Sequence, residues 1–306
     1  MQLGGGEGGK RSLSFYALAL FFGGFVLFLY GPMLTIIILS FQGPDGGLTF
    51  PMNGVSTVWF GKLIEGVGVV DIWSAFGRSI KLGLVVMGVT VVFSVLAGLA
   101  YRRRFVGATA LFYIVIASLI VPSIVVSLGI GLEFRLLDDA IKRYGDTHGI
   151  EWIGQHFTTS MGLFRSALGA HLTWTLPFGL LIMFAVLNRF NPAYEEAARD
   201  LGASSWQTFR HVVLPMIAPS LIGIALFGFT LSYDELARTA QAIGGLNTLP
   251  LTLQGLTTTV TTPVIYALGA VTTGISFLAI FTTLAIILSM RRRQAQRGSD
   301  AGKGMV

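Results

Sequence analysis

Long apolar stretches separated by short polar segments dominate this chain of 306 residues. Six stretches are long enough, at roughly 20 residues or more, to cross a bilayer as helices. Because unpaired backbone groups cannot face lipid, helices are the only spanning elements available to them. We therefore predict an all-α integral membrane protein with about six transmembrane helices, over residues 13–41, 79–101, 107–132, 166–187, 216–238 and 264–290.

The composition supports a membrane location. Hydrophobic residues make up 53% of the chain and charged residues only 12%, whereas soluble domains carry about 25% charge. The net charge of +6 could indicate a nucleic-acid partner, but the basic residues lie beside the apolar stretches, which favours membrane anchoring. The chain has no cysteine, so disulfides and thiolate metal sites are excluded.

The distribution of Lys and Arg predicts the orientation. Of the 21 basic residues, 13 lie in the two tails (1–12 and 291–306), the turn at 102–104 and the polar segment 188–215. Because cytoplasmic loops are enriched in Lys and Arg, we expect both termini and segment 188–215 to be cytoplasmic. The chain then divides into a cytoplasmic tail (1–12), a six-helix membrane domain (13–290) that includes segment 188–215, and a basic cytoplasmic tail (291–306).

Segment 188–215 is the longest charged interruption between two spans. Asn191 followed by proline is a typical helix start, and Gly202 stands where a helix over 194–201 would stop. Ser204 and Gln207 form a capping box for a second helix. The segment is therefore expected to be helix, glycine turn, helix, lying on the membrane surface.

The same segment resembles the EAA loop of ABC-importer permeases, whose pattern is EAA, three residues, Gly, nine residues, Ile-x-Leu-Pro. The second helix is expected to end at the proline of this pattern. Val212 stands for the isoleucine, and Glu195 precedes the motif. The matching residues are Glu196, Ala197, Ala198, Gly202, Leu214 and Pro215.

This resemblance implies a type I ABC-importer architecture in which the loop is a coupling helix that docks into a cytoplasmic ATPase. The implied partners are a second permease subunit, identical or different, two ATPase subunits and an extracytoplasmic substrate-binding protein. The chain itself is expected to bind no cofactor, with ATP and Mg²⁺ on the ATPase. Its one P-loop-like string, residues 4–10, is followed by Arg11 where Ser or Thr is needed.

Ionisable residues at the outer end of the fifth span are candidates for a substrate path. Tyr233, Asp234 and Glu235 are adjacent, and two carboxylates beside a phenol ring could hold an ammonium group by charge and cation–π contact. Two other interpretations stay open. The acids could lie among lipid headgroups, or Arg238 could pair with Asp234 one helical turn away.

Several short motifs resemble the polyamine (spermidine/putrescine) branch of these permeases, over about residues 79–290. They are Phe229 to Glu235, Thr248 to Leu251, Pro263 with Tyr266 and Ala267, and Ala170 to Phe178. Three positions depart from the branch: Glu235 replaces Asp, Tyr266 replaces Asn, and Ser123 stands where Asp is usual. The resemblance therefore implies a polyamine substrate, while a monoamine or zwitterion such as an aminobutyrate, an aminophosphonate or an opine fits about as well.

Two other functional classes were weighed. An intramembrane enzyme needs a nucleophile with a base, or an HExxH helix, and the sequence has neither pattern. A stand-alone ion-coupled transporter of a small amine predicts internal symmetry and acids near mid-span, which the sequence does not show clearly. His171 lies alone in the fourth span and is interpreted as a structural, hydrogen-bonded histidine.

Overall fold

The computed structural model describes residues 12–47, 49–66, 71–103, 105–259 and 262–303. Within these ranges the ordered elements are helices, and the one β contact is an isolated bridge between Gln42 and Val55. The predicted all-α class is therefore confirmed. The chain divides into two compact units, residues 1–69 with 256–278 and residues 70–255 with 279–306.

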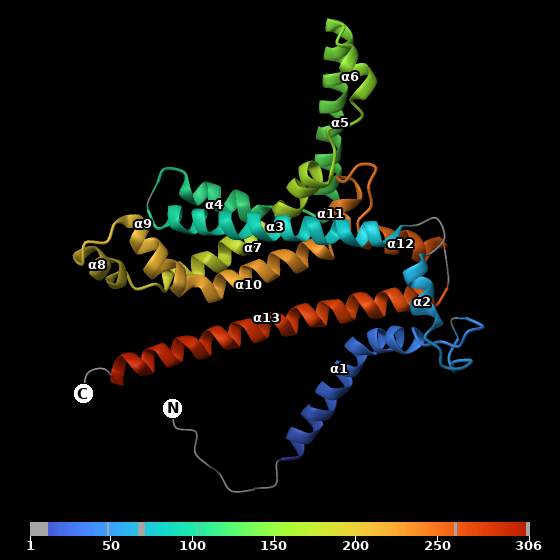
Figure 1. The fold of residues 1–306 in the computed structure, drawn as a ribbon, viewed down its shortest axis with the longest axis horizontal. Coiled ribbons are helices and arrows are strands. Elements are labelled where there is room, and N and C mark those ends of the chain that lie inside the picture. The colour runs from blue at the N-terminus through green and yellow to red at the C-terminus, as the bar shows by residue number, and fades with distance from the viewer. Residues whose placement is uncertain (1–11, 48, 67–70, 104, 260–261, 304–306) are drawn as a thin grey trace. The chain divides into compact units, whose positions relative to one another are not determined.

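Three long helices form the core of the second unit: α3 (Ile72–Tyr101), α7 (Leu168–Asn188) and α10 (Leu214–Tyr233) (Figure 1). Their buried faces share one cluster, in which Val95, Met183, Leu187, Val213, Ile217 and Ile224 pack together. Glycines allow the helices to approach closely, because a Cβ atom at Gly98 or Gly179 would collide with Met183 or Ser94. A hydrogen bond between Thr90 and Thr175 (2.8 Å) crosses the same seam.

Four helices in the described part of the chain are long and apolar enough to span a membrane: Leu13–Leu39, Ile72–Tyr101, Leu163–Asn188 and Ser205–Tyr233. They correspond to the first, second, fourth and fifth predicted spans. Two shorter apolar helices, Ala108–Ala117 and Val264–Leu278, lie where the third and sixth were expected. The boundaries differ from the prediction, since the second span begins seven residues earlier and the fifth ends at Tyr233.

The third predicted span, 107–132, is not one helix. It consists of α4 (Ala108–Ala117) and the first part of α5 (Ser123–His148), separated by a break. Pro122 adopts an extended conformation there, as expected where a proline has no N–H to continue a helix. Ser118 stabilises the break by donating from its hydroxyl to the carbonyl of Thr173 in α7 (2.8 Å).

Residues 133–165, between the third and fourth predicted spans, begin with a continuation of α5. Helix α5 runs on to His148, and α6 (Glu151–His156) packs back against it, so that the pair projects away from the α3–α7–α10 core (Figure 1). Asp138 fixes the base of this arm, where it accepts hydrogen bonds from Thr159 and from the backbone of Ser160 (2.6 Å). Burial acts to raise the pKa of Asp138, but the hydrogen bonds from Ser160 and Thr159 outweigh it and hold the pKa below its ordinary value.

Between the fifth and sixth predicted spans, the described residues of the threonine-rich stretch 239–263 include the end of α11 (Ala237–Ala240) and α12 (Leu249–Thr259). Residues 260–261 lie outside the described ranges. Helix α13 covers Val264–Lys303.

The first unit contains α1 (Leu13–Leu39) and α2 (Val58–Glu65), joined by a loop that is built around Gln42. The Gln42 side chain is fully buried and its amide nitrogen donates to the carbonyl of Gly47 (3.1 Å), while the backbone carbonyl of Gln42 accepts the indole N–H of Trp59 (2.8 Å). The side-chain oxygen Oε1 of Gln42 is buried without a hydrogen-bond partner among the described residues.

Candidate functional site

Segment 188–215, the predicted coupling segment, begins with a capped helix. Helix α8 covers Ala193–Asp200, and the Asn191 side chain accepts a hydrogen bond from the N–H of Ala193 (3.1 Å). Two of the three acidic residues of the helix, Glu195 and Glu196, lie in its first turn. Negative charge is favourable there because the helix dipole is positive at its N-terminus.

Helix α8 ends in a Schellman motif. Gly202 has a φ of +86°, its N–H donates to the carbonyl of Arg199 (2.8 Å), and the N–H of Ala203 donates to the carbonyl of Ala198 (3.0 Å). Only glycine adopts this left-handed conformation without a steric cost. The predicted role of Gly202 as a helix stop is confirmed.

The second helix of the segment starts as predicted and ends differently. In α9 (Ser205–Thr208), Ser204 and Gln207 form the reciprocal capping box, with the Ser204 N–H donating to Gln207 Oε1 (2.8 Å). Pro215 does not break the helix. A π turn, η2 (Phe209–Val213), leads directly into α10, because its wider turn accommodates the proline that follows.

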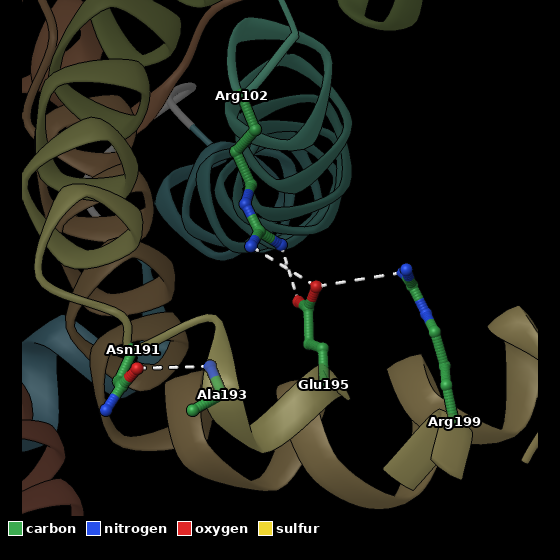
Figure 2. A network of polar contacts seen from close by, with 5 residues as sticks. All are labelled: Arg102, Asn191, Ala193, Glu195 and Arg199. Atoms are coloured by element: carbon green, nitrogen blue, oxygen red, sulfur yellow. Dashed lines mark hydrogen bonds and ion pairs between the residues drawn. The ribbon is translucent and has the colours of Figure 1, made fainter. Parts of the chain in front are cut away.

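An ion pair ties the coupling helix to the end of α3. Arg102 donates to both carboxylate oxygens of Glu195, at 2.5 Å and 3.3 Å, and Arg199 approaches the same carboxylate at 3.9 Å (Figure 2). The Glu195 side chain is only 13% exposed. The Arg102 guanidinium also lies 5.6 Å from the ring centroid of Phe190. Sequence reasoning treated Arg102 as a topological charge and missed this pairing.

The opposite face of the coupling segment is free of such contacts. Glu196 and Ala197 are exposed, and no hydrogen bond or ion pair of the Glu196 side chain is found within the described ranges. Three large apolar side chains are also exposed, Leu201 at 90%, Trp206 at 64% and Tyr194 at 52%. Exposed apolar side chains in a polar segment that joins two spans are typical of a protein-docking surface.

The C-terminal end of α10 holds the predicted acidic cluster. Tyr233 is the last residue of the helix, packed on Phe76 and Phe229, and Asp234 follows it with an exposed side chain. Glu235 accepts a hydrogen bond from the backbone N–H of Arg238 (2.9 Å). Both carboxylates can still accept further groups, Glu235 through its second oxygen and Asp234 through an exposed side chain.

The expected Asp234–Arg238 pair does not form in the described structure. The Arg238 side chain is fully buried, donates to the hydroxyl of Thr173 (3.0 Å), and stacks on Trp174 with the guanidinium carbon 4.7 Å from the ring centroid. Sequence reasoning offered the Asp234–Arg238 pair as one of several interpretations, because the two residues are four positions apart. Its burial depends on α7, which is remote in sequence.

His171 is structural, as predicted. It is almost completely buried, and its two ring nitrogens lie 2.8 Å from the hydroxyls of Ser232 and Thr239. Both nitrogens are thus satisfied, and the histidine links α7 to the end of α10 and to α11.

The two other candidates for the substrate path, Ser123 and Tyr266, lie in different compact units. Ser123 is the first residue of α5, one turn before Ser127, whose hydroxyl donates to the carbonyl of Arg238 (2.9 Å). The start of α5 therefore lies beside the segment that follows the acidic cluster. Tyr266 lies in α13 in the other compact unit. In the described part of the chain, no group of His, Cys, Asp and Glu could hold a metal ion.

The described chain is a helical membrane protein. Helix α8, outside its spans, is anchored by an ion pair and presents Glu196, which has no ion pair within the described ranges. These features fit the membrane subunit of an ATP-driven importer. The family is shown by sequence: residues 72–295 match the binding-protein-dependent transport system inner membrane components, and the chain belongs to that family. It is a permease of a binding-protein-dependent ABC importer, a multi-pass inner membrane protein. The stand-alone ion-coupled transporter is not favoured.

Curated relatives include polyamine permeases. The chain is 30% identical over 227 residues to the putrescine transport system permease protein PotI of Escherichia coli K12, covering 73% of this chain and 74% of the relative. It is 28% identical over 246 residues to the spermidine/putrescine transport system permease protein PotC of Haemophilus influenzae, covering 80% of this chain and 86% of the relative. The resemblance to this branch is confirmed as homology.

Solved structures share the fold. A bacterial ABC transporter involved in the import of the acidic polysaccharide alginate aligns with a TM-score of 0.57 at 16% identity, covering 93% of this chain and 95% of that one. The same transporter in complex with its pentasaccharide-bound periplasmic protein aligns with a TM-score of 0.54 at 16% identity, covering 92% and 94%. At this identity the likeness supports the fold alone.

Proposed function

We propose that this permease imports a small amine, of the polyamine type or related to it, and that ATP hydrolysis on a separate subunit drives transport through segment 188–215. The homology to putrescine and spermidine/putrescine permeases supports the amine. The exposed carboxylate of Asp234 at the outer end of α10 supports it independently, because a cationic amine is attracted to a carboxylate beside an aromatic residue.

The coupling assignment rests on one observation: Glu195 is held by Arg102, while Glu196, the next residue of the same helix, and Leu201, which follows its last residue, are both exposed. In this proposal the Arg102–Glu195 ion pair fixes α8 on the permease, and the exposed face of α8 that carries Glu196 docks into the ATPase. Ala197 and Ala198 permit close approach, Gly202 sets the turn, and Leu214 and Pro215 transmit the displacement into α10.

The full assembly would contain this chain, a second permease subunit, two ATPase subunits and an extracytoplasmic binding protein. Both termini and the coupling segment would face the cytoplasm, in keeping with the distribution of Lys and Arg. Closure of the ATPase subunits would move the coupling helices, and the spans would alternate between outward and inward access. Ser123, Tyr233, Asp234, Glu235 and Tyr266 would contribute to the substrate path.

The test is ATPase activity of the complete complex in proteoliposomes, with binding protein and with putrescine, spermidine, 4-aminobutyrate or 2-aminoethylphosphonate. We expect at least one amine to stimulate hydrolysis and Glu196→Ala to abolish the stimulation. Glu151→Ala, an exposed glutamate on the α5–α6 arm, is the matched control and should retain it. Stimulation of Glu196→Ala to the wild-type level would disprove the coupling role, and no response to any amine would disprove the substrate class.

A further inference from the structure

Small and hydroxyl-bearing residues line the seam between α3 and α7. Thr90 of α3 lies opposite Thr175 of α7, and their hydroxyls, 2.8 Å apart, form the hydrogen bond found between the two helices in the described part of the chain. One turn further along both helices, Ser94 of α3 lies against Gly179 of α7. The contacts thus repeat every four residues on both helices, which run in the same direction along the seam.

Ser94 carries a hydroxyl that has no partner in this arrangement. The residue is 1% exposed, and its Oγ atom is buried without a hydrogen-bond partner among the described residues. The hydroxyl points at Gly179, because a Cβ atom added to that glycine would overlap it. A buried hydroxyl that is never bonded costs free energy, and alanine at position 94 would avoid that cost. A second arrangement in which Ser94 is bonded would account for the hydroxyl.

The seam is built to allow such an arrangement. If α3 moves along α7 by one helical turn, about 5.4 Å, Ser94 comes opposite Thr175 and Gly98 comes opposite Gly179. The hydroxyl of Thr175 then bonds Ser94 in place of Thr90. Two glycines meet in the new contact, so no side chain blocks it. The hydrogen bond of the seam is therefore exchanged rather than lost.

Helix α10, which also packs on α3, is compatible with this movement. The ring of Phe229 in α10 lies against α3 at Gly83, where it would be 3.0 Å from an added Cβ atom. After a shift of one turn the same ring meets Met87, whose unbranched side chain adapts its shape. Helices α7 and α10 stay together, because His171 of α7 is bonded to Ser232 of α10 (2.8 Å). Helix α3 is therefore the element that slides.

The N-terminal end of α3 also has a connection that can follow it. Arg78 donates to the carbonyl of Asn247 (2.6 Å), and the hydroxyl of Ser79 accepts the N–H of Leu249 (2.8 Å). Between these residues and α11 lies Gly244, with a φ of +78°. Because glycine has the most permissive backbone, the stretch bonded to α3 can move while α11 stays with α7.

We propose that α3 occupies two registers against α7, one helical turn apart, in which the hydroxyl of Thr175 bonds either Thr90 or Ser94, and that the transport cycle switches between them. The inference rests on the proposed drive through segment 188–215 and names a contact that changes inside the membrane domain. Arg102, which follows the last residue of α3, is bonded to Glu195 of α8, so displacement of α8 acts on α3 directly.

The chain has no cysteine, so pairs of introduced cysteines can report the register. Thr90→Cys/Thr175→Cys reports the register of the structure, and Ser94→Cys/Thr175→Cys reports the shifted one. Val86→Cys/Thr175→Cys, one turn in the opposite direction, is the matched control. The complete complex with binding protein is oxidised with copper phenanthroline in proteoliposomes, without nucleotide and after trapping with ATP and vanadate. Mass spectrometry quantifies the linked peptides, and melting temperature in detergent confirms that each variant is folded.

We expect the 90–175 and 94–175 links to exchange between the two conditions, each changing by about fivefold or more, because a disulfide forms only over a narrow range of Cα–Cα distances. The 86–175 link should stay low in both. A 90–175 link of equal yield in both conditions, with no 94–175 link in either, would overturn the proposal. A rise of the 86–175 link on trapping would overturn it too, since Ser94 would then not be the second partner.

Ser94→Ala is a second measurement that needs no cysteine. Loss of the partner of Thr175 in the shifted register should lower substrate-stimulated ATP hydrolysis by roughly three- to tenfold without lowering the melting temperature. Ser74→Ala, which changes an exposed serine of the same helix, is the control and should match the wild type. Wild-type stimulation in Ser94→Ala would contradict the proposal and leave amine import standing. If no amine stimulates hydrolysis while the links still exchange with nucleotide, the proposed substrate class fails and the two registers stand.

Discussion

Arg102 and Glu195 form a bidentate ion pair between the end of α3 and the first turn of the coupling helix, with the shorter contact at 2.5 Å (Figure 2). The pair joins residues 93 positions apart in sequence. Because α3 is one of the three core helices, the ion pair gives the coupling segment a contact with the helix bundle in addition to the covalent connections at its two ends. Displacement of α8 can thus reach α3 directly.

Breaking this pair should weaken coupling without unfolding the protein. A partly exposed ion pair contributes up to about 1 kcal/mol, so Arg102→Ala should lower substrate-stimulated ATP hydrolysis by roughly fivefold. Arg103→Ala, which alters the neighbouring exposed arginine, is the control and should have little effect. The charge-swapped double variant Arg102→Glu/Glu195→Arg should recover part of the activity, and equal losses in single and double variants would argue against a pairwise role.

The exposed apolar face of the coupling segment should be needed for association with the ATPase. Leu201 is 90% exposed, so Leu201→Asp should change the unfolding free energy by no more than about 0.5 kcal/mol. The same change should weaken ATPase binding by about tenfold or more if Leu201 lies inside the interface. Co-purification of the ATPase measures this, with Leu246→Asp as a control on another exposed leucine. Undiminished co-purification would place the interface elsewhere.

Gly202→Ala tests the turn that ends α8. No atom lies within 4 Å of the position of an added Cβ, so any effect comes from the left-handed backbone alone. We expect a local loss of about 1 kcal/mol, seen as faster amide exchange at the last turn of α8. Gly61→Ala in helix α2, where φ is not positive, should be neutral or slightly stabilising. Unchanged exchange in Gly202→Ala would show that the turn tolerates a side chain.

A compensating pair tests the packing of α3 against α7. A Cβ at Gly179 would overlap the hydroxyl of Ser94, which is buried without a hydrogen-bond partner in the described structure. Gly179→Ala should therefore destabilise the bundle by about 1–3 kcal/mol. Ser94→Ala should be nearly neutral alone, and the double variant should recover much of the loss. Melting temperature in detergent measures each, and equal melting temperatures for Gly179→Ala and the double variant would contradict the predicted overlap.

The sequence by itself determined the features that depend on neighbours a few residues apart. The length of the apolar stretches predicted the membrane class and the position of most spans. The polar segment 188–215 contained its own helix start and helix stop signals. The capping box of Ser204 and the turn at Gly202 formed as predicted because their hydrogen bonds close within five residues. The EAA spacing was sufficient to identify the family.

Only the tertiary structure decided which distant side chains meet. The helix break at Pro122 is stabilised by the hydrogen bond from Ser118 to Thr173 of α7. The helix continues through Pro215 because a π turn precedes this proline. Arg102 pairs with Glu195, and Arg238 turns away from Asp234 into α7, because helix packing sets the surroundings of a long side chain more strongly than its nearest sequence neighbours. Spacing along the chain reports local hydrogen bonds, whereas burial and charge pairing depend on which helices lie side by side.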